Sequence, residues 1–364
     1  MKDRDAPHGA SVAQATLGYH RGVSGSPRWI RFGVSIGLAV LLLGLFLRNL
    51  DFAAVAEAIR GARPGWIVLA VAAGLLGTPP IRAWRWGRLL KEYPARPLHL
   101  NVATAIGFAA STLLPARAGE IVRPVALSRL GGLPLTPCLL SIALERLIDL
   151  ISTLVLFVVF VIGWAPASLG GDEAARFDLL RKSALLIGAG AAAAIVFLTI
   201  FALRPDLARR IAAPFFRLFP AKISARLESV LSHLLDGIAA LRSPRDAALV
   251  AAQSALLWLV ICVQIWCTLK AFDLTFPFPV TFFVLAWGVV GLAIPTPGGV
   301  GGYHTAIAYC LAGFYAVPRN TAAAFALVSH AVSFVPITLL GLGFLLAGGF
   351  SLKALSSKEA GLSG

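Results

Sequence analysis

The chain has 364 residues, of which 58% are hydrophobic and only 13% are charged, and its formal net charge is +15. Several stretches approach the roughly 20 apolar residues that a helix needs to span a bilayer, which excludes an ordinary soluble helical protein. No motif for binding RNA or DNA is visible. A surplus of Lys and Arg is instead typical of cytoplasmic loops, whose natural partners are anionic lipid head groups.

The N-terminal segment 1–28 mixes Gly, Ser, His and charged residues without periodicity, and we expect a disordered cytoplasmic tail. A cleavable signal peptide is not expected, because the first apolar run begins only near Ile30. The four cysteines lie in or beside apolar segments, with no spacing typical of a zinc site or a disulfide framework. We therefore expect no metal site and no cofactor.

The lengths of the apolar runs predict an all-α polytopic membrane protein with about six full spans and two broken segments, which a hydropathy count would report as about eight spans. The expected full spans are 30–47, 66–82, 137–163, 183–203, 247–271 and 321–349. The chain then divides into a first membrane half (29–203), a basic amphipathic cytoplasmic linker (204–246), a second membrane half (247–350) and a cytoplasmic tail (351–364).

The two broken segments, 100–131 and 279–315, are interrupted in the middle by proline and glycine. The first break contains Pro115 and Gly119, and the second contains Pro297, Gly298, Gly299, Gly301 and Gly302. Lipid cannot satisfy an interrupted backbone, so such breaks persist at membrane depth only inside protein or beside a watery cavity. Each segment is expected to form a re-entrant helical hairpin, the alternative being a pair of short spans.

The charges of the connecting loops predict the orientation. Segments 82–99 and 204–246 are rich in Lys and Arg and are expected in the cytoplasm, whereas the acid-rich connection near Asp172 fits the outside. Both termini then lie in the cytoplasm of a multi-pass protein of the bacterial inner membrane. Trp84 and Trp86, which flank an arginine in the first of these loops, are expected to be interfacial anchors.

With this threading the two broken segments enter the membrane from opposite sides, which indicates an inverted repeat. Three features recur at a nearly constant offset: Pro297 follows Pro115 by 182 residues, Pro318 follows Pro134 by 184, and His330 follows Glu145 by 185. Paired interruptions at corresponding places in two halves are the sequence signature of a transporter's central site.

Arg117, Glu120 and Arg123 directly follow the proline of the first break. A helix that starts there would direct its unpaired N–H groups and its positive end into the break, and arginine adds planar donors suited to phosphate. We interpret these residues as a head-group site, because charge in an interrupted membrane segment indicates function by default. The alternative is a basic interfacial loop held by Arg–Glu pairing.

Glu145, Arg146 and Asp149 lie inside a long apolar run, and the two carboxylates are four residues apart, so they share a helix face. Each ionised group would cost about 2.5–3.5 kcal/mol if it met lipid at the bilayer centre, so all three must face protein, water or one another. They could line a substrate path, with Arg117 or Arg123 as partners. Alternatively, they could form a self-contained ion-pair cluster that locks helices together.

The second break offers mainly backbone, because four of its residues are glycine. Its N–H groups could form an anion-binding concavity, whereas the alternative is glycine for tight helix packing. His304 and His330 are candidates for proton-linked or head-group contacts, and the alternative is that each is a hydrogen-bonded packing residue.

These motifs resemble the flippase-like membrane domain of the lysylphosphatidylglycerol synthases, the multiple peptide resistance factor family, and its stand-alone relatives. The resemblance covers about residues 30–350 and rests on Leu-Pro-Ala-Arg-Ala-Gly-Glu (114–120) with Arg123, on Glu145-Arg146 with Asp149, and on Pro-Gly-Gly-Val-Gly (297–301). It implies movement of a polar-headed lipid between leaflets. The positions carried over are Arg117, Glu120, Glu145, Arg146 and Asp149.

The chain departs from this family in two respects. Many relatives place a glutamate soon after the glycine-rich break, where this chain has Tyr303 and His304. No counterpart of the soluble aminoacyl-transferase domain is found, so we expect a stand-alone member that does not itself synthesise an aminoacylated lipid. Stand-alone relatives occur beside varied lipid pathways, including isoprenoid-linked sugars and hopanoids, so the family does not fix the substrate.

The predicted function is therefore that of a lipid flippase or transporter, not an enzyme. It would move a phospho- or isoprenoid-linked lipid between leaflets through a charged cavity at the repeat interface. No ATP-binding motif is visible, so the movement would be downhill or ion-coupled. The alternatives are an integral-membrane enzyme of lipid or glycosyl-carrier metabolism and a membrane scaffold for such an enzyme. A partner enzyme of lipid biosynthesis and a homo-oligomer stay open, whereas nucleic acid is not an expected partner.

Overall fold

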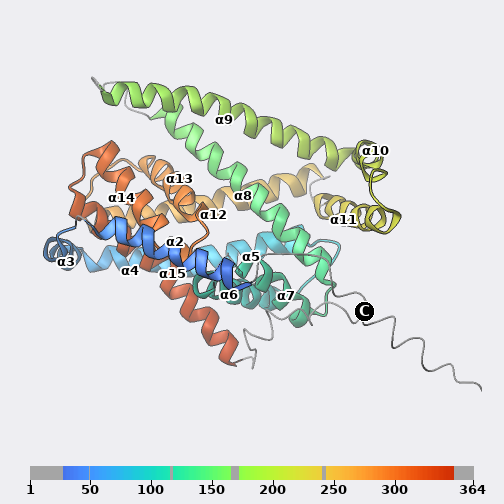
Figure 1. Cartoon of the computed structure of the whole chain (residues 1–364), viewed down its shortest axis with the longest axis horizontal. Helices are drawn as coiled ribbons and strands as arrows, with labels where there is room; N and C mark the ends of the chain where they lie inside the picture. Colours follow the sequence, from blue (N-terminus) through green and yellow to red (C-terminus); the bar gives the residue numbers. More distant parts are fainter. Residues whose placement is uncertain (1–27, 49, 115–117, 165–171, 240–242, 348–364) are drawn as a thin grey trace, which may run out of the picture.

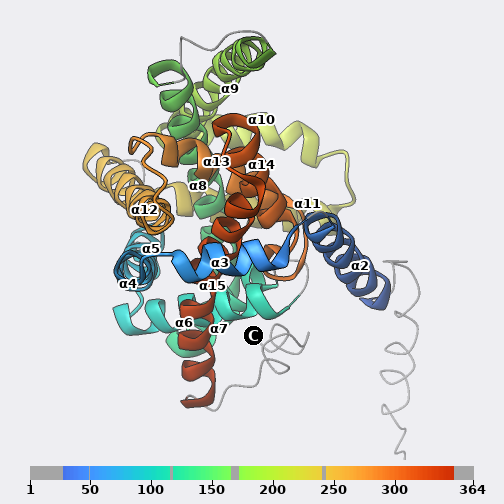
Figure 2. The ribbon, with the colours of Figure 1, turned by 90° about the vertical axis from the view of Figure 1, so that its left-hand side faces the viewer.

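All regular elements are helices in the part of the chain that the computed structural model describes, namely residues 28–48, 50–114, 118–164, 172–239 and 243–347 (Figures 1 and 2). The helices are α2 (Arg28–Leu47), α3 (Phe52–Gly61), α4 (Pro64–Ala72), α5 (Thr78–Leu89), α6 (Pro97–Leu113), α7 (Gly119–Gly131), α8 (Leu135–Gly163), α9 (Asp172–Leu203), α10 (Pro205–Phe216), α11 (Ala221–Ala239), α12 (Pro244–Ala271), α13 (Val280–Ala293), α14 (Gly302–Tyr315) and α15 (Arg319–Ala347). A π-turn, η1 (Ala73–Gly77), and a 3-10 turn, η2 (Pro297–Gly299), complete the described elements. The predicted tail 351–364, all but the last residue of the predicted tail 1–28, and Pro115 and Arg117 of the first break lie outside the described residues.

Five helical segments among the described residues are long and apolar enough to cross a membrane. They are Pro64–Leu89, Leu135–Gly163, Lys182–Leu203, Pro244–Ala271 and Arg319–Ala347. A sixth span results if α2 and α3, which are bent by 86° relative to each other, act together. The predicted all-α polytopic membrane fold is confirmed.

The first of these spans joins α4, η1 and α5, and it packs antiparallel against α12. Gly74 and Gly77 allow the two backbones to approach closely. A Cβ atom at Gly74 would lie 2.3 Å from Nε2 of Gln264, and one at Gly77 would lie 2.6 Å from Cγ1 of Val260. The π-turn coincides with this contact, and π-turns within α-helices are frequent at functional sites.

Helices α6 and α7 form a tight antiparallel hairpin. Helix α6 ends where Leu114 becomes extended ahead of a proline, a position that disfavours helical backbone. Gly119 then begins α7 with no room for a side chain, since a Cβ atom there would lie 2.0 Å from both the carbonyl oxygen of Gly107 and Oγ of Ser111. The hairpin depends on this contact, because small residues are what let membrane helices approach so closely.

Helices α13 and α14 form a second hairpin that closes in the same way. Between them, Gly298, Gly299 and Gly301 have φ angles of 58°, 72° and 83°, which side-chain-bearing residues rarely adopt. A Cβ atom at Gly302 would lie 2.5 Å from the carbonyl oxygen of Gly291. The glycines of the second break are therefore needed both for backbone conformation and for helix packing.

The second break lies against the last turn of α6, just before the first break. A Cβ atom at Gly298 would lie 3.2 Å from the carbonyl oxygen of Thr112, which is in the last turn of α6. The hydroxyl of Thr112 accepts a hydrogen bond from Thr338 on α15 at 3.0 Å. In Figure 1, α13 and α14 lie toward one end of α8, whereas α6 and α7 lie toward its other end. The hairpins thus approach each other from opposite ends of the molecule.

The helices around the two hairpins repeat in length and in packing. Helices α8 and α15 each have 29 residues, and their first residues are 184 positions apart. Gly132 and Ala316, which end α7 and α14 in the left-handed conformation, are also 184 positions apart. Helix α6 packs on α15, and α13 correspondingly packs on α8. These correspondences support an internal duplication, and its inverted orientation in the membrane stays a prediction.

Helices α9 and α11 pack against α8 at one side of the molecule, and α10 packs against both of them (Figures 1 and 2). Helix α10 exposes Leu207, Ile211 and Phe215, which are spaced four residues apart, while Arg209 and Arg210 are also exposed. This pattern is typical of a helix that lies along a membrane surface. Such a placement of the linker stays a prediction.

Candidate functional site

A buried ionic cluster lies where α5, α7 and α8 meet. We call six residues the central cluster: Arg82 and Arg85 of α5, Arg123 of α7, and Glu145, Arg146 and Asp149 of α8. Both carboxylates come from α8, where their four-residue spacing places them on one face. The cluster therefore depends on three helices that are separated in the sequence.

Glu145 is bound by three of the arginines. Its Oε1 accepts hydrogen bonds from Nη1 of Arg82 at 2.9 Å and from Nη1 of Arg123 at 2.6 Å. Nη2 of Arg146 donates to the same oxygen at 2.5 Å. Hydrogen bonds between ionised partners are roughly twice as strong as neutral ones, so this carboxylate cross-links α5, α7 and α8.

Asp149 binds the remaining arginine, Arg85, which connects the cluster to α12. Its Oδ1 accepts a hydrogen bond from Nη2 of Arg85 at 2.6 Å, and its Oδ2 accepts one from Nη1 of Arg82 at 2.8 Å. Nη2 of Arg146 lies 3.1 Å from Oδ2. Arg85 also donates from Nη1 to Oγ of Ser254 at 3.0 Å. The cluster thus contacts both membrane halves.

The central cluster carries more positive than negative charge. Five of its six side chains are buried, whereas the side chain of Arg146 is 40% exposed. Four guanidinium groups face two carboxylates in this network of described residues, which leaves a formal surplus of two positive charges. Among the cluster's buried atoms, five donors have no hydrogen-bond partner in the described part of the chain: Nε of Arg82, Arg85, Arg123 and Arg146, and Nη2 of Arg123. One acceptor, Oε2 of Glu145, also has none. Unused donors beside surplus positive charge can bind an anion.

Trp86 supports the cluster from α5, which corrects its predicted role as an interfacial anchor. The guanidinium of Arg123 lies over its ring, 4.1 Å from the centroid, and the indole N–H donates to Oγ of Ser141 at 2.8 Å. Trp86 is fully buried, whereas Trp84 is 51% exposed. On a helix, residues two apart point in different directions, so only Trp84 is placed to face lipid.

Arg82 and Arg85 are the cluster members that the sequence did not reveal. The basic residues predict a cytoplasmic loop from residue 82 onward, but both arginines lie in α5 and are almost completely buried. Their three-residue spacing, which makes neighbours on a helix surface, matches the four-residue spacing of Glu145 and Asp149. Two arginines on one helix face and two carboxylates on another could have indicated a shared ionic site from the sequence alone.

A second constellation forms at the glycine-rich break. Nδ1 of His304 accepts a hydrogen bond from the backbone N–H of Gly301 at 3.2 Å. Nε2 of His330 lies 2.7 Å from the carbonyl oxygen of Gly298, which can only accept, so this nitrogen carries a proton. The ring centroids of the two histidines are 4.6 Å apart. Both imidazoles therefore stabilise the break, and their role toward a substrate or a proton stays a prediction.

The structure brings most predicted site residues into these two groups. Arg123, Glu145, Arg146 and Asp149 meet in the central cluster, and His304 and His330 meet at the second break. Glu120 lies in the first turn of α7, one turn before Arg123. Helix α6 lies between the groups, because Arg82 lies 5.7 Å from the ring centroid of Phe108 and the following turn of α6 contacts the second break.

Comparison with known proteins places this architecture in a family. The family described as the lysylphosphatidylglycerol synthase TM region matches residues 29–341. The chain is 26% identical over 345 residues to a protein named glycosyltransferase AglD from Haloferax volcanii, covering 89% of this chain and 55% of that protein. It therefore spans about half the length of this relative. It is also 27% identical over 296 residues to a UPF0104 membrane protein from Methanothermobacter thermautotrophicus, covering 76% of this chain and 82% of that protein. The chain belongs to the family of the lysylphosphatidylglycerol synthase transmembrane region.

Proposed function

We propose that the protein moves a lipid with a phosphate-bearing head group from one membrane leaflet to the other. The observation that carries this proposal is the surplus of positive charge in the central cluster: three buried arginines face two buried carboxylates, and the partly exposed Arg146 adds a second surplus charge. The negative charge of a phosphate would neutralise this surplus positive charge. Its oxygens could also accept hydrogen bonds from Nε and Nη2 of Arg123, which have no partner among the described residues. The lipid tail would meanwhile stay in the bilayer.

A purely structural ion-pair cluster would be expected to have balanced charge. Burying an ion costs several kcal/mol unless close partners compensate it, so each arginine beyond the number of carboxylates opposes folding. Glu145 would still be paired by Arg82 and Arg146 if Arg123 were neutral. The presence of Arg123 is therefore better explained by binding of an anion than by cross-linking of helices.

The proposal includes an opening of the cluster. Of the six cluster side chains only that of Arg146 is exposed, so a head group could bind the other arginines only after the cluster opens. The adjacent non-helical breaks at Leu114 and η2 are the points where the hairpins could pivot, because hinges use a few residues that change backbone angles. Without an ATP-binding motif, net movement would follow a lipid or ion gradient.

A second candidate function is favoured by the relative whose name denotes a glycosyltransferase. In this case the chain would not move a lipid-linked glycosyl carrier to the other leaflet. It would instead catalyse a reaction on the carrier or bind it for a partner enzyme. Product formation by the purified protein in detergent, where no second compartment exists, would support this candidate over transport. A biosynthetic partner enzyme and self-association are compatible with both candidates.

Reconstitution into vesicles tests the transport proposal. Vesicles would contain phosphatidylcholine, fluorescently tagged phosphatidylglycerol as the probe, and the full chain, with dithionite added outside to quench accessible label. Transport predicts that nearly all label is quenched, whereas protein-free vesicles keep the inner-leaflet half. The same result in both preparations would contradict transport of this class of lipid.

Replacing Arg123→Gln separates transport from stability. We expect at least a tenfold slower quenching phase, because the surplus donor is lost, while the apparent melting temperature changes by only a few degrees. Arg129→Gln is the matched control, since Arg129 is an exposed arginine on the same helix. Normal transport by the Arg123 variant would show that the surplus charge has another purpose.

A further inference from the structure

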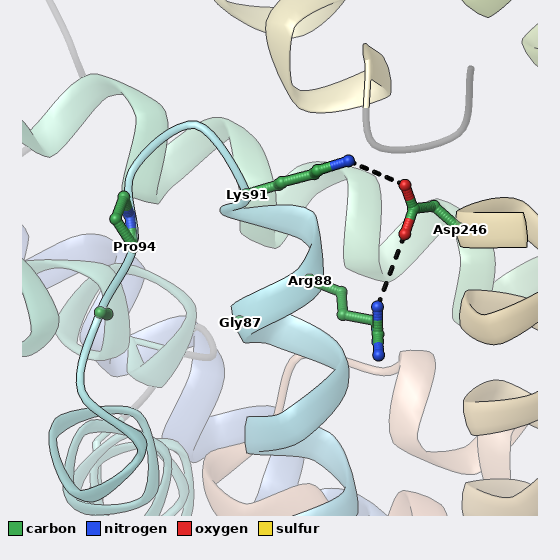
Figure 3. Close-up of a pocket in the computed structure, with 6 residues that line it drawn as sticks. Gly87, Arg88, Lys91, Pro94 and Asp246 are labelled. Carbon is green, nitrogen blue, oxygen red and sulfur yellow. Dashed lines mark hydrogen bonds and ion pairs between the residues drawn. The ribbon is translucent and has the colours of Figure 1, made fainter. Parts of the chain in front are cut away.

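A surface pocket lies at the end of α5, where this helix meets the beginning of α12 (Figure 3). It has a volume of about 280 Å³ and is lined by Gly87, Arg88, Lys91, Pro94, Ala95 and Asp246. In Figure 3, Arg88 and Lys91 extend from the end of α5 and its following turn toward Asp246 of α12, while Pro94 lies across the pocket. The side chain of Lys91 is 59% exposed, so the pocket opens at the surface.

The pocket contains two cations and one carboxylate. Nζ of Lys91 donates to Oδ2 of Asp246 at 2.9 Å, and Nη1 of Arg88 lies 3.5 Å from Oδ1. Nε of Arg88 is buried and has no hydrogen-bond partner among the described residues. One unit of positive charge and one buried donor are therefore available to a ligand, and Asp246 occupies the position that an anion would take.

The pocket is joined to the central cluster by a line of cations on α5. Arg82, Arg85 and Arg88 are three residues apart, so successive side chains are neighbours on the helix surface. Six residues of helix separate the first from the third, which corresponds to about 9 Å along the axis. Helix α12 runs alongside this row of arginines, because its Ser254 binds Arg85 and its Asp246 binds Arg88.

We infer that this pocket is a docking site for the phosphate of an anionic lipid head group before it enters the central cluster. The pocket volume of about 280 Å³ lies just below the range of about 300–1,000 Å³ that is typical of pockets for drug-sized ligands. The pocket therefore suits a smaller group, such as a phosphate with a small alcohol substituent. A lipid is favoured over free phosphate because Trp84, one turn before Arg88, is exposed, and exposed tryptophans are typical of the head-group level of a membrane. Docking does not depend on the proposed transport, whereas passage inward rests on it.

Asp246 would compete with a docked phosphate, which predicts the direction in which its removal changes the affinity for phosphate. A docked phosphate would replace the carboxylate as the partner of Arg88 and Lys91, so the two anions compete for the same donors. Removing the carboxylate should therefore strengthen phosphate binding. A role limited to joining α5 to α12 predicts no such gain.

The binding experiment uses the full chain in phosphatidylcholine nanodiscs, titrated calorimetrically with water-soluble dihexanoyl phosphatidic acid and, in a second arm, with inorganic phosphate. Arg88→Gln combined with Lys91→Gln should weaken binding of the short-chain lipid at least tenfold, and Asp246→Asn should tighten it several-fold. Arg209→Gln combined with Arg210→Gln is the control, because it removes the same charge from exposed positions on α10 and should leave binding unchanged.

Each outcome decides a separate point. Equal affinity for inorganic phosphate and lipid would overturn the lipid assignment, and unchanged affinity in both the double variant and Asp246→Asn would overturn the pocket as a docking site. In the vesicle assay, the double variant should raise the lipid fraction needed for half-maximal rate while the maximal rate stays the same. If wild-type vesicles show no transport but the binding shifts occur, the docking site stands and the proposed transport fails.

Discussion

At the scale of single residues, Glu145 is the junction of the fold and the candidate site. One of its carboxyl oxygens accepts hydrogen bonds from arginines of α5, α7 and α8, and the side chain is fully buried. Loss of its charge would leave the buried guanidinium groups of Arg82, Arg85 and Arg123 with Asp149 as the one remaining counter-ion in this network. Neutralising Glu145 should cost much more folding free energy than neutralising one arginine. The first change increases the surplus of positive charge in the cluster, whereas the second reduces it.

Glu145→Gln is therefore predicted to destabilise the protein by about 3–5 kcal/mol, the range found when one partner of a buried ion pair is removed. The measurement is thermal unfolding in detergent, which should show a clear loss of apparent melting temperature. Glu57→Gln serves as the control, since Glu57 is an exposed glutamate on α3 and its replacement should change stability by less than about 0.5 kcal/mol. Equal melting curves for the two variants would mean that the network contributes little to folding.

The two carboxylates of the central cluster could be predicted from the sequence, whereas their contacts with Arg82 and Arg85 could not. Glu145 and Asp149 were identifiable because ionised groups in a long apolar run must find partners, and their spacing placed them on one face. Their partners Arg82 and Arg85 are 63 to 67 residues away in the sequence. Local patterns do not encode such a contact, and the rule that basic residues mark cytoplasmic loops led to the wrong environment for both arginines.

At the scale of elements, the two hairpins depend on glycine contacts rather than on side-chain interlocking. In each, one glycine faces the carbonyl oxygen of another, Gly119 with Gly107 and Gly302 with Gly291. The breaks themselves were predictable, because proline and glycine interrupt apolar runs visibly. The close contact of the end of α6 with the second break was not, since it depends on how α6 and η2 pack across the molecule.

Gly119→Ala and Gly302→Ala are each predicted to destabilise the protein, because the added methyl group would lie 2.0 Å and 2.5 Å, respectively, from a backbone oxygen. Overpacking of this kind costs about 1–3 kcal/mol, and a rigid backbone neighbour favours the upper end. Thermal unfolding in detergent measures the effect.

Gly343→Ala on α15 is the control for both variants, since no atom lies within 4 Å of the new methyl group. It should be neutral or slightly stabilising, because alanine favours helix more than glycine does. If all three variants unfold at the same temperature, the hairpins tolerate separation and do not depend on these contacts.

At the scale of the whole molecule, we propose that the two halves are related by a two-fold axis in the membrane plane. The span that contains α5 and its counterpart α12 pack antiparallel, with Gly74 near Gln264 and Gly77 near Val260. Corresponding spans that run in opposite directions place corresponding loops on opposite membrane sides. This arrangement is typical of transporters with inverted repeats.

Cysteine labelling tests this orientation. The loop after α5 and the loop after α12 should face opposite sides, and Glu92 and Thr275 are exposed positions in them. In a variant without the four buried native cysteines, an impermeant maleimide added to intact cells should label Thr275→Cys at once. It should label Glu92→Cys only after permeabilisation. Labelling of both positions from one side would reject the inverted arrangement.

The exchange of packing partners between halves has a consequence for the origin of the chain. Because α6 rests on α15 and α13 rests on α8, each half completes its core with a long helix of the other. If the halves descend from one ancestral gene and the proposed inverted arrangement holds, the ancestor would have buried these surfaces as a pair of identical subunits inserted in opposite orientations. Fusion of two such copies would have fixed one orientation for each, after which only one of them needed to keep the ion-rich helix.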